Sequence, residues 1–145
     1  MVVTSGSSDR TIKLWNTSDG TVIRDFVLPS SQPAVTTVAT TPFAYPFAHP
    51  GWVYSVHFTN DGKFLVSAGN APENRGFLAV WGVADGKLQF GQEFPLGPFF
   101  SVAVSPDGKL MALACGPRNR QSPEANAYVL KMPELDKKGI AEVRK

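Results

Sequence analysis

The chain has 145 residues, of which 43% are hydrophobic and 18% charged, and its 14 basic and 12 acidic residues give a formal net charge of +2. This is the composition of one globular domain with its own core, and it excludes a chain that is disordered throughout. The balance of charges argues against a nucleic-acid partner, and no apolar run reaches the roughly 18 residues of a membrane-spanning helix.

The first strand-like segments lie close to the N-terminus, in TSGSSDRTIKLWNTSDGTVIRDF. Trp15 is followed four residues later by Asp19-Gly20, and an alternating segment comes next. Asp-Gly tolerates the left-handed backbone that a tight hairpin demands, so the pattern predicts two strands joined by a hairpin. We therefore expect residues 1–27 to be the last two or three strands of a four-stranded unit.

Residues 28–51 form a long connection rich in proline and aromatic residues, LPSSQPAVTTVATTPFAYPFAHPG. Connections of this length without structure of their own are usually functional or disordered. The aromatic residues, Tyr45 and Phe47 among them, favour packing over disorder. Three alternatives stay open: a functional insertion, a flexible linker, and a stray strand at VTTVAT.

Residues 52–95 contain all four strand signals of a complete unit. VYSVHF is followed by TNDGKFLVSAG, and FLAVW is followed by ADGKLQF, so that each pair of alternating segments has an Asp-Gly turn. Trp81 again stands four residues before Asp85-Gly86. The unit is predicted to be an antiparallel meander of four strands.

Residues 96–145 repeat the same unit in a degenerate form. SPDGKLMALACG matches TNDGKFLVSAG, but in AYVLKMPELDKKGIAEVRK we place Lys131 at the position of the tryptophan. Such decay is usual in a terminal repeat. Cys115, in LMALAC, is the only cysteine and is read as a small buried hydrophobic residue.

In an antiparallel meander, alternate connections lie at opposite ends of the sheet. The short Asp-Gly turns fall at one end, and the long connections around residues 29–51, 70–76 and 116–126 fall at the other. Variable loops at the surface are where binding residues concentrate. We therefore expect a candidate binding rim at this end, made by Tyr45, Phe47, Glu73, Arg75, Arg118 and Arg120.

Together, TSGSSDRTIKLWN, HPGWVYSVHFTNDGKFLVSAG and FLAVW resemble the repeats of the WD-repeat β-propeller family. The resemblance covers about residues 1–27 and 49–131. It implies an all-β fold of antiparallel four-stranded blades, with about two and a half blades in an incomplete ring. It also implies a non-catalytic scaffold or protein-interaction module whose partners are other proteins.

The resemblance further implies a hydrogen-bonded network of Trp, Ser or Thr, His and Asp that holds each blade together. By position, the network residues in this sequence are Ser5, Asp9, Trp15, His49, Ser67 and Trp81. In the second blade NAPENRG replaces the turn in which the aspartate belongs. A buried tryptophan needs a partner for its N–H group, so these residues are read as structural.

The sequence contains no set of residues that predicts catalysis. It has no GxSxG motif and no phosphate-binding glycine motif, and its two histidines are too few for a metal site. We therefore expect no enzyme activity, no metal and no cofactor. Two alternatives stay open: a sensory or docking part of a larger enzyme, and a propeller hydrolase with metal-binding carboxylates.

Propellers close with about four to eight blades, and closure removes their free sheet edges. With fewer blades we expect open edges that favour self-association. We also expect Met1 to be an internal residue or a misassigned start of a longer propeller, rather than the start of a chain whose copies close one ring. The absence of a secretory signal and the single cysteine favour the cytoplasm.

Overall fold

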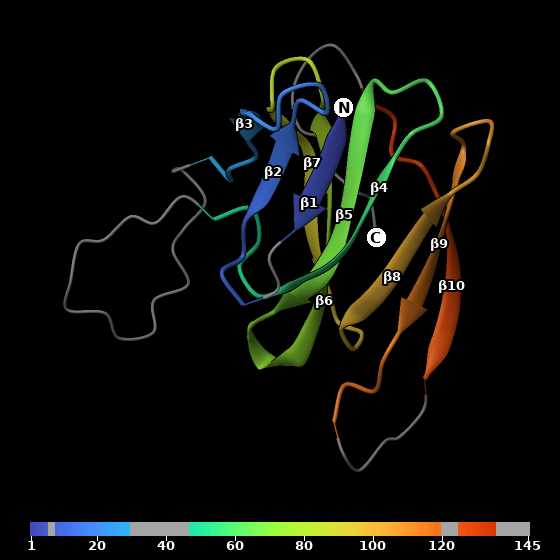
Figure 1. Ribbon diagram of the computed structural model, residues 1–145. Coiled ribbons are helices and arrows are strands. Elements are labelled where there is room, and N and C mark those ends of the chain that lie inside the picture. Colours follow the sequence, from blue (N-terminus) through green and yellow to red (C-terminus); the bar gives the residue numbers. More distant parts are fainter. Residues whose placement is uncertain (6–7, 30–46, 120–124, 136–145) are drawn as a thin grey trace, which may run out of the picture.

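The computed structural model describes residues 1–5, 8–29, 47–119 and 125–135, which form ten strands in three antiparallel sheets (Figure 1). The first sheet has the order β1-β2-β3, and the second has the order β4-β5-β6-β7. The third has the order β10-β9-β8. Each sheet is a meander whose neighbours in sequence are neighbours in space, and the ring is not closed. The predicted all-β, antiparallel fold is confirmed.

The strands are short, as expected for propeller blades. The first sheet contains β1 (Val2–Ser5), β2 (Ile12–Trp15) and β3 (Val22–Asp25). The second contains β4 (Val53–Phe58), β5 (Phe64–Ala71), β6 (Arg75–Gly82) and β7 (Leu88–Phe94), with a single 3₁₀ turn, η1 (Pro72–Asn74), between β5 and β6. The third contains β8 (Phe99–Val104), β9 (Leu110–Cys115) and β10 (Asn126–Lys131). The domain boundaries predicted above stay predictions, and most of residues 28–51 lies outside the described residues.

Asp-Gly turns close the hairpins at one end of the sheets. Their four glycines have φ between 69° and 71°, a left-handed backbone that glycine adopts without strain. In the β4–β5 turn the Asp61 carboxylate accepts hydrogen bonds from the Thr59 hydroxyl at 2.6 Å and from the Lys63 N–H at 3.0 Å. These bonds, that of Thr59 first, hold the pKa of Asp61 below its ordinary value. The turns therefore satisfy their own polar groups.

The second sheet is buried on both faces and organises the core. One cluster, between the first and second sheets, includes Ile12, Leu14, Val53, Leu65 and Trp81. The other, between the second and third sheets, includes Val66, Leu78, Val80, Phe99 and Leu113. In Figure 1 the third sheet lies beside the second, with β8 toward β4 and β10 at the outer edge. Because both faces of this sheet are buried, β5 and β6 have apolar residues at successive positions.

The register of the third sheet corrects one sequence alignment. In the second sheet Leu65 pairs with Trp81, whereas Met111, its counterpart in the Asp-Gly repeat, pairs with Leu130. The place of the tryptophan is thus taken by Leu130 and not, as predicted, by Lys131. Leu130 packs against the core cluster between the second and third sheets, which Lys131 could not do without burying a charge.

Candidate functional site

Three of the predicted network residues meet in the interior of the second blade. Trp81 on β6 donates its Nε1–H to the Ser67 Oγ on β5 at 2.9 Å, and the same oxygen lies 2.7 Å from the Nε2 of His49. All three side chains are 0% exposed. His49 stands in the segment that leads into β4, so this chain of hydrogen bonds links three separate parts of the blade.

The network stops at His49. Among the described residues its buried Nδ1 has no hydrogen-bond partner, and the sequence of this blade lacks the aspartate of the family pattern. Burial lowers the pKa of His49 to about 3, so the imidazole is neutral near neutral pH. The Phe77 ring meets it edge-on with centroids 4.8 Å apart. A histidine enclosed in this way is not accessible as a general base.

In the first blade the strand register corrects the predicted position of the network serine, Ser5. Lys13 pairs with Thr4, while its counterpart Ala79 pairs with Ser67, so Thr4 rather than Ser5 takes the place of Ser67. Ser5 instead pairs with Ile12. Neighbouring residues of a strand point to opposite faces, so this shift matters. The side chain of Ser5 lies outside the described part.

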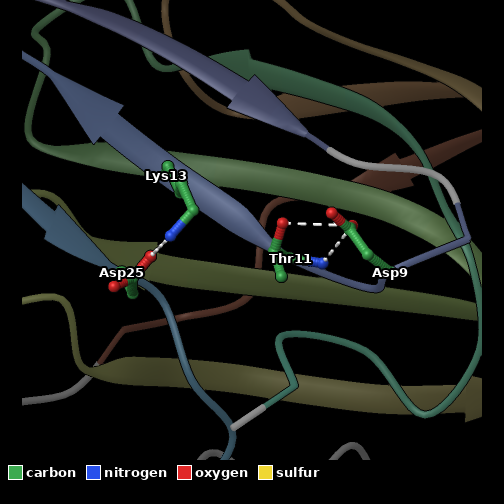
Figure 2. A network of polar contacts seen from close by, with 4 residues as sticks. All are labelled: Asp9, Thr11, Lys13 and Asp25. Atoms are coloured by element: carbon green, nitrogen blue, oxygen red, sulfur yellow. Dashed lines mark hydrogen bonds and ion pairs between the residues drawn. The ribbon is translucent and has the colours of Figure 1, made fainter. Parts of the chain in front are cut away.

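Asp9 and Trp15, the other network residues predicted for the first blade, differ in burial and contacts. Asp9 accepts hydrogen bonds from the backbone N–H and the hydroxyl of Thr11, each at 3.1 Å (Figure 2). Trp15 is half-buried on β2. Figure 2 also shows the exposed ion pair between the Lys13 Nζ and the Asp25 Oδ1, at 2.5 Å, which links β2 to β3. The contacts of Asp9 with Thr11 and of Lys13 with Asp25 are thus local and exposed.

The end with the long loops is held together by Asn74. Its side-chain amide donates to the carbonyl of Pro117 at 3.1 Å and to that of Arg118 at 2.9 Å. Asn74 has a left-handed backbone with φ of 56°, which asparagine tolerates better than most residues. The β5–β6 turn of the second blade is therefore joined to the loop that follows β9 in the third.

The charged residues predicted for the rim have different partners. The Arg75 Nη1 lies 3.2 Å from the Glu93 Oε2, and its Nε lies 3.9 Å from the Glu73 Oε2. The exposed Arg118 donates to the Pro95 carbonyl at 3.5 Å and, in the described part of the chain, has no carboxylate within 4.0 Å.

The other predicted rim residues come from the long insertion and the third-blade loop. Phe47 is covered by the guanidinium of Arg10, which lies 4.9 Å from the ring centroid. Tyr45 and Arg120 lie outside the described residues.

Sequence reasoning missed Tyr54 and Phe100, two aromatic residues at this end of the inner strands β4 and β8. With Trp52 they form a line of edge-on contacts, 6.3 Å from Trp52 to Tyr54 and 5.0 Å from Tyr54 to Phe100 between centroids. The available signal was the matched pair of segments GWVYS and GPFFS, in which Tyr54 and Phe100 stand at the same offset.

Within the described ranges, no group of three His, Cys, Asp or Glu side chains could hold a metal ion. No helix in those ranges is both long enough and apolar enough to cross a membrane.

Comparison with known proteins gives matches to one family of repeats. The family model "WD domain, G-beta repeat" matches residues 1–16 and 41–71. Mouse apoptotic protease-activating factor 1 is 33% identical over 86 residues, which are 59% of this chain and 6% of that protein. The solved WD40 β-propeller domain of Doa1 aligns with a TM-score of 0.53 at 19% identity, covering 77% of this chain and 28% of the other.

These matches cover only a small part of each relative's length. The likeness to Doa1, at 19% identity, is one of fold alone. The repeat match, the aligned sequence and the fold agree with one another, and with the three sheets described above. The chain therefore has the fold of part of a β-propeller, and its residues 1–16 and 41–71 match WD repeats.

Proposed function

We propose that the chain is a non-catalytic protein-interaction module that binds through the end with the long loops. We call this end the long-loop rim and define it by the described residues Phe47, Glu73, Asn74, Arg75 and Arg118. WD40 propellers generally mediate protein–protein interactions and are typically not enzymes, which supports the proposal. A fold alone does not determine a function, so the proposal is argued from the residues of the long-loop rim.

The observation that carries the proposal is the contact of Asn74 with the carbonyls of Pro117 and Arg118. Loops that act together in binding must keep a defined relative position, and here one amide joins the loops of two blades. At the opposite end the Asp-Gly turns are short and satisfy their own polar groups. The long-loop rim is therefore the better candidate for recognition.

Two residue types that often act in catalysis are used otherwise in this chain. His49 is buried and bonded to Ser67, and its pKa is lowered to about 3. Cys115 is buried, its thiol lies 3.2 Å from the Gly97 carbonyl, and burial raises its pKa, which disfavours the reactive thiolate. Neither group supports a nucleophilic or general-base role.

The proposal can be tested by site-specific photocrosslinking in cells that produce the full-length protein. A photoreactive residue at Arg118 should give discrete crosslinks to other proteins, whereas one at Lys63, in the short β4–β5 turn, should not. Asn74→Gly keeps the left-handed backbone but removes the amide, so it should lower the yield at Arg118. Asn60→Gly, at the short-turn end, is its control. Crosslinks from Lys63 alone, or from neither position, would contradict the proposal.

A further inference from the structure

The first sheet has one apolar face that belongs to neither of the two described core clusters. It carries the cross-strand row Val2, Trp15 and Val22, in which Val2 is 46% and Val22 is 42% exposed. We call these three residues the first-sheet face. The solvent face of an antiparallel sheet is normally polar, so a row of exposed apolar side chains indicates a surface that another element covers.

The third sheet has a second such face. Its cross-strand row is Ala103, Ala112 and Val129, with Leu110 on the same side of β9. All four side chains are exposed, Val129 to 69% and Leu110 to 42%. We call these four residues the third-sheet face. The alternate residues of β9 point the other way and enter the core between the second and third sheets.

The second sheet shows what each face does when a neighbour covers it. By register, Leu65 and Trp81 are the counterparts of the first-sheet face, and they pack on the first sheet. Val66 and Val80 are the counterparts of the third-sheet face, and they pack on the third sheet. All four are at most 0% exposed. Each free face is therefore the counterpart of a face that is fully buried one sheet away.

The two free faces also complement each other in size and charge. The two alanines of the third-sheet face leave room for a large side chain, and the first-sheet face offers the half-buried ring of Trp15. Next to that ring Lys13 and Asp25 form an ion pair and neutralise each other. Lys131 is the only charged residue of β8, β9 and β10, and its long side chain can keep the ammonium group in water.

We propose that a second copy of this chain covers the third-sheet face with its own first-sheet face. The contact is head-to-tail and repeats the packing of the second sheet on the third. Such a contact forms a ring when the rotation closes. Two copies with three sheets each give six, within the range of about four to eight blades in closed propellers. We therefore expect a closed dimer. The inference goes beyond the proposed function and does not depend on it, because it uses no residue of the long-loop rim.

The test is the mass of the full chain in solution, measured by light scattering behind a sizing column over a range of concentrations. The expected mass is twice the 15.6 kDa of one chain. Val129→Glu and Val22→Lys each place a charge in an apolar contact, so each should raise the dissociation constant of the dimer at least about tenfold. Trp52→Glu changes a comparably exposed apolar residue outside both faces, and it should leave the mass unchanged.

A mixture of Val129→Glu and Val22→Lys tests the head-to-tail arrangement. In a mixed dimer one contact joins two unchanged faces, and the other joins the two changed faces, whose new charges are opposite. The mixture should therefore regain the mass of the dimer, although neither variant does so alone. A contact between two like faces would be lost in one variant only and would give no such rescue.

Four results would overturn the inference: a monomer at every concentration, a polydisperse aggregate, a dimer that persists in either variant, and a mixture without rescue. A monomer or an aggregate is the result expected if further sheets of a longer polypeptide cover the two faces. Each variant is first checked for an unchanged β-sheet circular dichroism spectrum. Leu110→Glu and Val2→Lys, at exposed positions of the same two faces, replace a variant that fails this check.

Discussion

The second and third sheets have the same turns and the same bulge, yet they are held together differently. In the second sheet a buried polar trio, Trp81, Ser67 and His49, spans the blade. In the third sheet Leu130 and Leu113 take the places of Trp81 and Ser67 in the register. The repeat of 46 residues between Val53 and Phe99, which occupy matching positions, puts Pro95 in the place of His49.

This comparison teaches that the tryptophan and its hydrogen-bond acceptor are kept together or replaced together within a blade. A buried tryptophan N–H without an acceptor costs more than its hydrogen bond contributes when made, whereas replacing every member by an apolar residue removes the demand. The third sheet has done the latter, and its residues Met111 and Leu113 are buried in the same core cluster. Sheets of one topology can therefore be stabilised either by a buried tryptophan with its hydrogen-bond acceptor or by apolar residues at both positions.

The largest expected difference between the two sheets concerns the tryptophan and its replacement. Trp81→Ala should reduce the free energy of unfolding by about 3–5 kcal/mol, because it removes a fully buried ring and leaves Ser67 without its donor. Leu130→Ala should cost less than about 2 kcal/mol, because Leu130 is only half-buried. Chemical denaturation of both variants checks this order, and equal losses would break the comparison.

A smaller loss is expected when the middle of the network is removed. Ser67→Ala should cost about 1–3 kcal/mol, since the Trp81 N–H and the His49 Nε2 both lose their partner in the interior. The double variant Ser67→Ala with Trp81→Phe should cost less than the sum of the two single changes, because Phe needs no acceptor. Denaturation curves for all four proteins give the coupling, and strict additivity would show that the hydrogen bond is unimportant.

The pH dependence of stability should come from the second sheet through His49. Its pKa is lowered from 6.5 to about 3 in the folded state, so the unfolded chain binds a proton first as the pH falls. This group leaves the free energy of unfolding unchanged above pH 6.5 and lowers it by about 1.4 kcal/mol per pH unit as the pH falls from 6.5 toward 3.

His49→Gln should flatten the slope of the unfolding free energy over the upper part of this window. His57→Gln changes an exposed histidine on β4 and serves as the control. A slope that is the same in His49→Gln as in the parent chain would mean that His49 is not the group that titrates.

The smallest effect is expected for the exposed ion pair of the first sheet. Lys13→Ala removes the ion pair with Asp25, in which the two side chains are 37% and 51% exposed. Water screens such a pair, so the melting transition should correspond to a loss below about 1 kcal/mol, and added salt should reduce it further. A loss as large as that of Ser67→Ala would mean that polar contacts stabilise the first sheet as strongly as the second.

The local structure of the blades was predictable from the sequence because its causes are local. Asp-Gly pairs determine the hairpins through the backbone freedom of glycine and the hydrogen bonds of aspartate, as at Gly62 and Asp61. The alternation of apolar residues and the turn signals were enough to predict antiparallel meanders, and the resemblance to WD repeats added the blades and the unclosed ring. His49, Ser67 and Trp81 were predicted from the resemblance to WD repeats, and the structure brings their side chains together.

Pairing between strands was decided only by the tertiary structure. Side chains alternate along a strand, so an alignment that is wrong by one residue assigns each side chain to the wrong face of the sheet. The register therefore puts Thr4 where the sequence predicted Ser5, and Leu130 where it predicted Lys131. The bulges at Tyr54 and Phe100 exist only in the ladder between two strands. The contact of Asn74 with Arg118 joins residues 44 apart in sequence, and its cause is the packing of one blade on the next.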